Sequence, residues 1–161
     1  RWIKVWVSSL KFSINFNGES IGYFAGSRGL RQGDPMSPYL FVIIMDFLDQ
    51  LMQRNISDNP LFKYHCKCDK LKIAHLCFAD DLLILFHGSA ESARTVRHTL
   101  DLFYDYTGLK ANNSKSCLFI CVVNDVLKEQ IGQILQFPFG ELPVRYLGVP
   151  LITLKLKKII F

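Results

Sequence analysis

The hydrophobic pattern at the start of the chain changes from a helical period to a period of two. Over residues 2–10, apolar side chains are spaced as in a helix. From 11 to 16, apolar and polar residues alternate, and a second extended segment follows at 21–24. Asn17 and Gly18 lie between these two segments and tolerate positive φ, so the sequence predicts a β-hairpin.

Three later segments carry apolar residues at helical spacing. The first is predicted over residues 38–54, behind a loop rich in glycine and proline. The second is predicted to begin after Ser89 and to stop at Gly108, and Asn124 is expected to cap a third, shorter helix. The residues predicted to face inward are Leu40, Ile43, Ile44, Phe47, Leu48, Leu51 and Met52, then Ala93, Val96, Leu100 and Phe103, then Leu127, Ile131, Ile134 and Leu135.

Four other apolar segments are shorter and are bounded by turn residues, as is typical of strands. They comprise residues 71–78, 82–86, 117–123 and 146–151. No internal repeat, low-complexity tract or linker separates them from the helices. We therefore expect one α+β domain over residues 1–161, with an antiparallel sheet and helices packed on one of its faces.

The composition is that of a chain with a packed core. Half of the 161 residues are hydrophobic and 20% are charged, which argues against intrinsic disorder. The longest apolar runs, Leu40–Met45 and Cys117–Val123, are shorter than the roughly 18 residues that a membrane span requires, so we expect no membrane association. The net charge of +5 points mildly to a polyanionic partner.

The five cysteines show no disulfide-framework spacing. Three of them lie in apolar runs, so we expect buried free thiols in a reducing, intracellular compartment, with nucleus and cytoplasm both open. Five potential zinc ligands also occur close together, but their spacing does not match a zinc site, and we expect none. The three cysteines are Cys77, Cys117 and Cys121, and the five potential ligands are His65, Cys66, Cys68, His75 and Cys77. We expect His75 to be a core histidine with a partner.

Two adjacent carboxylates, Asp80 and Asp81, interrupt the apolar segment from Phe78 to Phe86. Desolvation and mutual repulsion would disfavour two charges at this place unless something compensates them. A surface turn is one interpretation, because aspartate is a common turn residue. A divalent cation is the other, since Mg²⁺ prefers hard oxygen ligands and two such ions stabilise the attacking and leaving oxygens of a phosphoryl transfer.

Four segments, in their order along the chain, carry a family resemblance. They are Gly29–Phe41, Phe78–Asp81, Gly108–Ser116 and Tyr146–Leu151. Together they resemble the reverse transcriptases, and most of all those of LINE-type retrotransposons of plants, which lack long terminal repeats. The resemblance implies an incomplete reverse-transcriptase-like palm: its central and later parts, without the first catalytic-aspartate strand, the fingers and most of the thumb.

The resemblance also implies functional roles for particular residues. The implied catalytic residues are Asp80, Asp81 and Lys115. Asp80 and Asp81 would bind metal, and Lys115 would assist the departure of pyrophosphate. The residues implied to contact template and nucleotide are Arg31, Gln32 and Gly33, and those implied to contact the primer are Tyr146, Leu147 and Gly148. Each set also has a plain structural interpretation, as a tight turn into a helix, an exposed lysine after a turn, or strand packing.

By the same resemblance, the cofactor is Mg²⁺ or Mn²⁺, the substrates are deoxynucleoside triphosphates, and the partners are an RNA template and a DNA primer. The family's third metal-binding carboxylate should lie upstream of the glycine loop, but Glu19 is the only acidic residue between Arg1 and Gly33. We therefore expect an RNA-directed DNA polymerase as the parent protein and an inactive isolated chain.

The alternative is a remnant of a degenerate element with at most non-specific nucleic-acid affinity. The basic residues that would supply this affinity are Lys63, Lys67, Lys70, Lys72, Lys155, Lys157 and Lys158.

Overall fold

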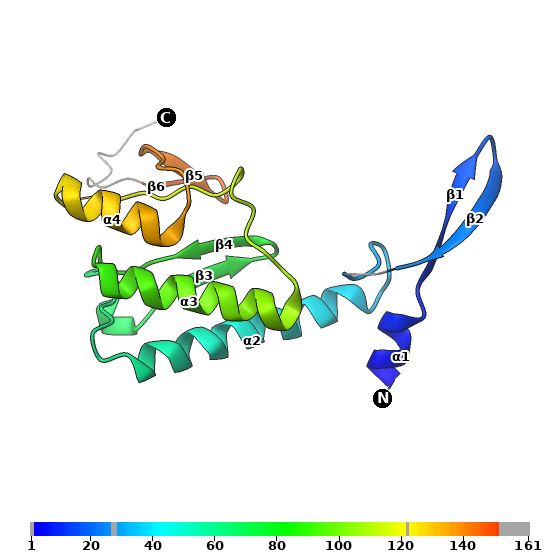
Figure 1. Cartoon of the computed structure of the whole chain (residues 1–161), viewed down its shortest axis with the longest axis horizontal. Helices are drawn as coiled ribbons and strands as arrows, with labels where there is room; N and C mark the ends of the chain where they lie inside the picture. Colours follow the sequence, from blue (N-terminus) through cyan, green and yellow to red (C-terminus); the bar gives the residue numbers. More distant parts are fainter. Residues whose placement is uncertain (1, 27–28, 122, 152–161) are drawn as a thin grey trace. The chain divides into compact units, whose positions relative to one another are not determined.

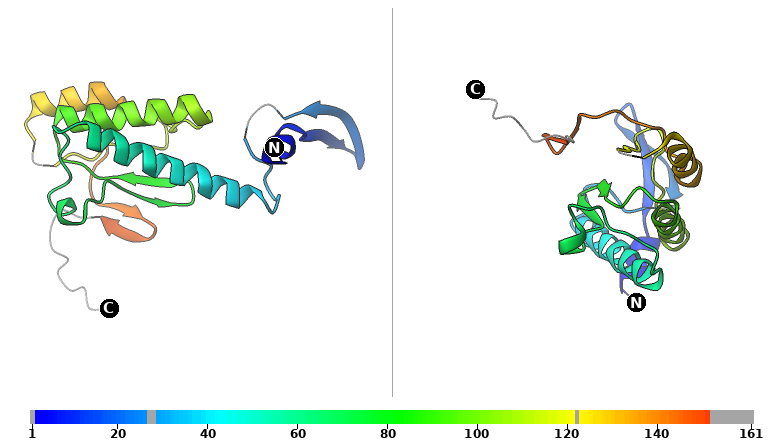
Figure 2. Two further views of the ribbon diagram at one scale, coloured as in Figure 1. Left: turned by 90° about the horizontal axis from the view of Figure 1, so that it is seen from below. Right: turned by 90° about the vertical axis from the view of Figure 1, so that its left-hand side faces the viewer.

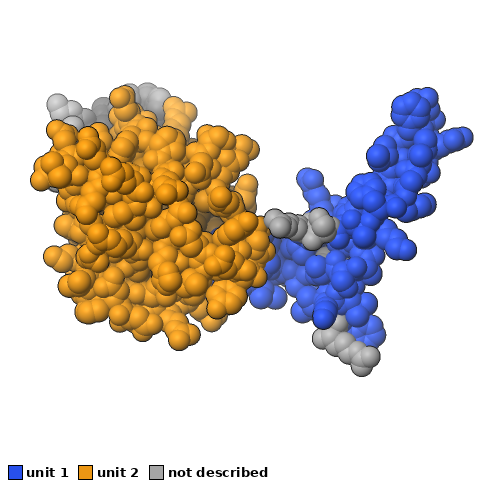
Figure 3. Space-filling model, in the orientation of Figure 1, with its two compact units in different colours: residues 1–47 blue, residues 48–161 orange. Residues whose placement is uncertain are grey.

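The computed structural model describes residues 2–26, 29–121 and 123–151, so the lysines predicted at 155, 157 and 158 lie outside the described residues. The chain divides into two compact units, residues 1–47 and 48–161 (Figure 3). Helix α2, Ser37–Asp58, begins in the first unit and ends in the second.

The first unit contains the predicted N-terminal helix and hairpin. Helix α1 spans Trp2–Ser8, strand β1 spans Lys11–Phe16 and strand β2 spans Glu19–Ala25. The turn consists of Asn17 and Gly18, whose φ angles of 51° and 85° require residues that tolerate left-handed backbone. The hairpin prediction is confirmed.

Large apolar side chains gather on one face of the β1–β2 hairpin. Phe12 pairs with Phe24 and Ile14 with Ile21, and the two phenylalanine rings stack with their centroids 5.9 Å apart. Phe16 lies on the same face because side chains alternate along a strand. Ile14, Phe16, Ile21 and Phe24 are 62%, 61%, 52% and 54% exposed, so the described residues of this unit leave the face largely uncovered.

Helix α2 ends at Asp58, later than the predicted end at Arg54. Leu48, Met52 and Ile56 are all buried, so the inward stripe of the helix continues for another turn. The helix ends within the turn-rich stretch from Ser57 to Pro60, which is where the sequence predicts a break. At the other end of the helix, Ile43 is 59% exposed, so its predicted inward position was wrong.

In the second unit, three helices lie along one side of a short hairpin (Figures 1 and 2). Helix α3 spans Ala90–Thr107 and α4 spans Asp125–Leu135, beside the C-terminal part of α2. The hairpin consists of β3, His75–Phe78, and β4, Asp81–Ile84. The core is formed by Met52, Ile56, Phe62, Ala74, Ala93, Val96, Leu118, Ile131 and Leu135. This arrangement confirms the α+β class with helices on one face.

The predicted helix ends are confirmed by their capping hydrogen bonds. The Ser89 side chain accepts from the amide of Ser92 at 3.3 Å, at the start of α3. Gly108 ends this helix with φ 73°. The Asn124 side chain accepts from the amide of Leu127 at 2.9 Å and starts α4.

Two side-chain hydrogen bonds join α2 to α3. Asn55 donates to the Thr99 hydroxyl at 2.9 Å, and Asn59 donates to the Thr95 hydroxyl at 2.8 Å. Asn55 and Asn59 are four residues apart on α2, as Thr95 and Thr99 are on α3. Both bonds therefore form together when the two helices are aligned as they are here. Among the described residues, no buried side-chain nitrogen or oxygen lacks a partner.

The strand predicted over residues 71–78 is shorter in the structure. Residues Asp69–Leu71 form a 3₁₀ turn, and Lys72 follows in the left-handed region with φ 53°. This backbone conformation is incompatible with an extended strand, so β3 begins only at His75.

The prediction of a buried strand over 117–123 was wrong for residues 117–121 and 123. Val122 lies outside the described residues. Only an isolated bridge joins Leu118 to Phe139. The Leu118 amide donates to the Pro138 carbonyl at 2.8 Å, and the Gly140 amide donates to the Leu118 carbonyl at 3.0 Å. Because proline has no amide hydrogen, Pro138 is unable to donate the bond that would continue this ladder toward residue 116.

Residues 146–151 form a hairpin rather than one strand. Strand β5 spans Val144–Tyr146 and β6 spans Val149–Leu151. Leu147 and Gly148 turn the chain with φ of 52° and 81°, and this positive φ at both residues breaks the extended run. The described strands therefore form three separate two-stranded antiparallel ladders and not one sheet.

The expected burial of the thiols was also wrong. Cys77, Cys117 and Cys121 are free but exposed, because their segments lie at a hairpin and in a loop rather than in a buried sheet. In the part of the chain that the structure describes, no helix has the length and apolarity needed to cross a membrane.

Candidate active site at the aspartate turn

Asp80 and Asp81 lie where the β3–β4 hairpin reverses direction. Phe78 pairs with Asp81, so Ala79 and Asp80 form a two-residue turn. Ala79 has φ 51°, while Asp80 has no positive φ, which is the pattern of a type II′ turn. The sequence predicted strands on both sides of the aspartates, and the structure confirms an antiparallel hairpin in which Asp80 lies in the turn and Asp81 is the first residue of β4.

The two carboxylates are exposed and uncompensated by protein charge. Within the described residues, no lysine or arginine lies within ion-pair distance of Asp80 or Asp81. Two neighbouring negative charges on one short turn attract a cation. Carboxylate oxygens are the hard ligands that Mg²⁺ prefers, so the donor set fits that metal.

The aspartate pair provides only part of a metal coordination shell. Mg²⁺ is usually held by one or two carboxylates, and water and substrate oxygens complete its octahedron. No group of three or more His, Cys, Asp or Glu side chains that could hold a metal ion occurs among the described residues.

Cys77 reports on the electrostatics of the turn. Partial burial of the thiol raises its pKa, and the charges of Asp80 and Asp81 raise that pKa further. Cys77 is nevertheless exposed as a residue, and its thiol donates to the Ala79 carbonyl at 3.3 Å. The thiol therefore experiences the negative charge of both carboxylates.

Tyr146 of β5 contacts the aspartate hairpin directly. Its hydroxyl is 3.3 Å from the carbonyl oxygen of Asp81 and 3.5 Å from that of Leu76. Burial raises the pKa of the Tyr146 phenol, and Cys77 and Asp81 raise it further. The structure thus brings together the predicted metal-binding and primer-contacting segments. The other two predicted primer residues, Leu147 and Gly148, form the exposed β5–β6 turn.

Lys115 lies in an exposed turn after α3. Its amide donates to the Asn112 carbonyl at 3.1 Å, and the Asn112 side chain accepts from the amide of Ser114 at 3.0 Å. Within the described ranges, no hydrogen bond or ion pair joins Lys115 to Asp80 or Asp81. Its catalytic role stays a prediction.

Arg31, Gln32 and Gly33 are exposed residues of the loop before α2, in the first unit. Gly33 has φ 84°, and the Arg31 carbonyl accepts from the Ser37 hydroxyl at 2.6 Å. The tight turn that the sequence predicted here is therefore present. Nucleotide and template binding by this loop stays a prediction.

His75 has the partner that was expected for it. Its Nε2 lies 3.6 Å from an Asp49 carboxylate oxygen on α2, and the His75 side chain is only 13% exposed. This confirms the interpretation of His75 as a core histidine with a partner.

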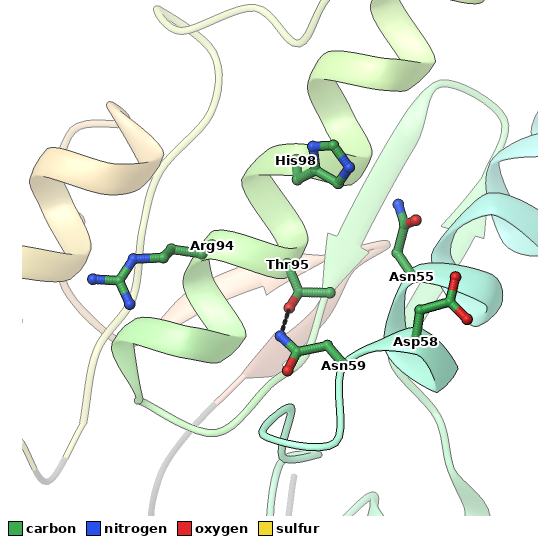
Figure 4. A pocket seen from close by; sticks show the side chains of 6 residues that line it. All are labelled: Asn55, Asp58, Asn59, Arg94, Thr95 and His98. Carbon is green, nitrogen blue, oxygen red and sulfur yellow. Dashed lines mark hydrogen bonds between the residues drawn. The ribbon is translucent and has the colours of Figure 1, made fainter.

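One polar pocket was not predicted from the sequence (Figure 4). It has a volume of about 350 Å³ and lies between the end of α2 and α3. Its lining residues are Asn55, Asp58, Asn59, Arg94, Thr95 and His98. The repeated spacing of four residues, in Asn55 and Asn59 and in Thr95 and Thr99, is the sequence signal that marks this contact between the helices.

Comparison with known proteins identifies the family. The family model described as reverse transcriptase (RNA-dependent DNA polymerase) matches residues 1–151. The chain is 33% identical over 103 residues to the retrovirus-related Pol polyprotein from type-2 retrotransposable element R2DM of Drosophila melanogaster. It is 47% identical over 57 residues to the Pol polyprotein from type-1 retrotransposable element R2 of Popillia japonica.

These matches cover 64% and 35% of this chain but only 9% and 8% of the two polyproteins. An uncharacterized mitochondrial protein of Arabidopsis thaliana is 43% identical over 65 residues, which are 40% of this chain and 53% of that protein. The chain thus spans about half of one relative and less than a tenth of the others. The R2 relatives support the expected kinship to elements without long terminal repeats. Because the family model matches almost the whole length of the chain, the chain belongs to the reverse transcriptase family.

Proposed function

We propose that this chain is the part of an RNA-directed DNA polymerase that presents the metal-binding aspartates. The observation that carries the proposal is the exposed Asp80–Asp81 turn, which has no cationic partner in the described residues of a reverse transcriptase family member. An uncompensated carboxylate pair is expected where a divalent cation is bound during phosphoryl transfer. The chain would correspond to the central and later palm over residues 1–161, and it would act inside the cell.

Each group of site residues would have its own role in the reaction. Asp80 and Asp81 would hold Mg²⁺ or Mn²⁺, which would stabilise the charge that develops on the transferred phosphate. Lys115 would offset charge on the leaving pyrophosphate of a deoxynucleoside triphosphate. Arg31, Gln32 and Gly33 would contact the RNA template and the incoming nucleotide. The turn at Leu147 and Gly148, together with Tyr146, would lie against the DNA primer.

The chain alone would be inactive. Positioning and electrostatics provide nearly all of phosphoryl-transfer catalysis, and two carboxylates from adjacent residues are insufficient to fix both ions of a two-metal site. A further carboxylate would have to come from another strand, and Glu19 lies directly after the Asn17–Gly18 turn, at the start of β2.

The experiment is primer extension on an RNA template with Mg²⁺ or Mn²⁺. It compares this chain with a longer protein, in which the chain is joined to the upstream aspartate strand and fingers of a related R2 element. We expect extension by the longer protein only, and its loss in Asp80→Asn and Asp81→Asn.

Asp105→Asn is the matched control, because Asp105 is an exposed carboxylate on α3 in the same unit. Extension by the longer protein that survives Asp80→Asn would refute the proposed metal site. Extension by the short chain would refute its predicted inactivity.

A second candidate function is non-specific nucleic-acid binding by a remnant without catalysis. Four lysines of one segment, Lys63, Lys67, Lys70 and Lys72, are exposed around the 3₁₀ turn before β3. Lys72 is engaged with Asp69 at 2.8 Å, which leaves three to meet a phosphate backbone. Failure of the longer protein to extend any primer, with binding retained, would favour this function.

A further inference from the structure

The phenolic hydroxyl of Tyr146 links two hairpins that are far apart in sequence. It lies 3.3 Å from the carbonyl oxygen of Asp81 and 3.5 Å from that of Leu76, and the residues Tyr146 and Asp81 are 65 positions apart. Both carbonyls belong to the hairpin that ends in the aspartate turn. Tyr146 therefore holds the backbone of a candidate metal-binding residue.

This contact is isolated. The other side-chain hydrogen bond at the hairpin end, from Cys77 to the Ala79 carbonyl, stays within the hairpin. The Tyr146 hydroxyl, by contrast, donates to residues 76–82 from another element. Without this bond, Asp80 in the two-residue turn and Asp81 next to it would be held in place mainly by the short β3–β4 ladder.

The chemistry of the phenol suits this task. A tyrosine hydroxyl donates a hydrogen bond only while it is protonated. The Tyr146 side chain is half-buried, and the two hairpin oxygens within reach of its hydroxyl are carbonyls, which can only accept. The phenol is therefore the donor in this contact.

We infer that Tyr146 is a positioning residue of the metal site, which fixes the Asp81 backbone so that the Asp81 carboxylate is held ready for a divalent cation. The inference rests on the proposed function, because it assigns a role to the same site. Ligands held in place before binding lose less conformational freedom when the metal arrives. Removal of the hydroxyl should therefore weaken metal binding without unfolding the chain.

The first test concerns the contact itself, in the full 161-residue chain. Carbonyl ¹³C chemical shifts are compared between the unchanged protein and Tyr146→Phe, which deletes only the hydroxyl. Shifts at Asp81 and Leu76 are expected to change. Tyr23→Phe is the matched control, because Tyr23 is 77% exposed in the first unit, and it should leave both carbonyls unaltered.

The second test measures Mn²⁺ binding by paramagnetic broadening of the Asp80 and Asp81 resonances. Tyr146→Phe should raise the Mn²⁺ concentration at half broadening by roughly three- to tenfold, the effect of one lost hydrogen bond. Tyr23→Phe should leave it unchanged. Circular dichroism and the melting temperature of each variant report separately on folding.

The outcomes separate the inference from the proposed function. If Tyr146→Phe is folded and binds Mn²⁺ as the unchanged protein does, or if the Asp81 carbonyl shift does not move, the positioning role is refuted and the metal site stands. If the unchanged protein shows no broadening at Asp80 and Asp81, the metal site is refuted and the positioning role with it.

Discussion

Asn59 of α2 and Thr95 of α3 are joined side chain to side chain at 2.8 Å, across 36 positions of sequence (Figure 4). The Thr95 hydroxyl in turn donates to the Glu91 carbonyl at 3.1 Å, and Asn55 and Thr99 repeat the arrangement one helical turn away. Thr95 and Thr99 are buried, and each threonine hydroxyl is the acceptor for the amide of its asparagine. These two bonds set the register in which the helices above the aspartate hairpin pack.

The first prediction follows from this pair. Thr95→Val keeps the side-chain volume but leaves the Asn59 amide without its acceptor, so the free energy of unfolding should fall by about 1 to 2 kcal/mol. Urea unfolding measures the change. In a double-mutant cycle, Asn59→Ala should cost less in the Thr95→Val background than in the unchanged protein. Strictly additive losses would contradict the coupling.

The second prediction uses Cys77 as a reporter of the neighbouring charges. Because partial burial and then Asp80 and Asp81 raise the pKa of its thiol, a cation bound at the aspartates should lower that pKa and increase the thiolate fraction. Alkylation of Cys77 by iodoacetamide at pH 7.5 should accelerate roughly two- to fivefold on saturation with Mg²⁺. Peptide mass spectrometry measures the rate at each cysteine.

The aspartate variants provide the control for this measurement. Asp80→Asn and Asp81→Asn should accelerate alkylation of Cys77 without Mg²⁺ and should reduce its response to Mg²⁺, whereas Asp105→Asn should do neither. A Mg²⁺ response of Cys77 that is the same in all three variants would contradict cation binding at the turn.

The third prediction concerns stability at alkaline pH. Because the pKa of Tyr146 is raised in the folded chain, the folded state keeps its proton at pH values where the unfolded state loses it. This contribution is fully present below the tyrosine pKa of the unfolded chain, about 10, and is lost as pH rises through the folded value. Unfolding in urea between pH 8 and 11 should show a steeper loss for the unchanged protein than for Tyr146→Phe.

Tyr23→Phe removes the same hydroxyl from an exposed tyrosine and should follow the curve of the unchanged protein. If Tyr146→Phe gives that same curve, Tyr146 makes no contribution to the alkaline loss.

The fourth prediction concerns nucleic acid. Lys67→Gln combined with Lys70→Gln should weaken binding to an RNA–DNA hybrid and reduce the slope of log affinity against log salt concentration by roughly 1 to 2. Filter binding between 50 and 200 mM salt measures both quantities. Lys4→Gln with Lys11→Gln removes equal charge from the first unit. An equal loss of slope in both double variants would assign the effect to net charge rather than to the segment before β3.

The features that the sequence predicted correctly depend on a few adjacent residues. Asn17 and Gly18 provide the positive φ of one turn, and Ser89 and Asn124 accept the first free amides of their helices. Such signals act over three or four positions. The aspartate turn belongs to the same class, because its position between two apolar segments is visible in the sequence.

The features that it missed depend on distant partners. The segment at 117–121 is apolar enough for a strand, but its described residues form only the isolated bridge between Leu118 and Phe139, and Pro138 beside that bridge has no amide hydrogen to donate. The bond from Tyr146 to Asp81 likewise joins elements that no local pattern relates. Family resemblance supplied a role for Tyr146, whereas its contact with the aspartate hairpin emerged only from the fold.

The one-sided β1–β2 hairpin has a consequence for how the protein behaves once it is purified. A ribbon of two strands has an unpaired backbone edge on each side, and here it also carries Ile14, Phe16 and Phe24 in contact with water. When two molecules associate through this hairpin, they bury exposed apolar surface and pair free backbone N–H and C=O groups at the same time. Aggregation should therefore depend more strongly on protein concentration than on temperature. Dilution should keep the chain in solution better than cooling does.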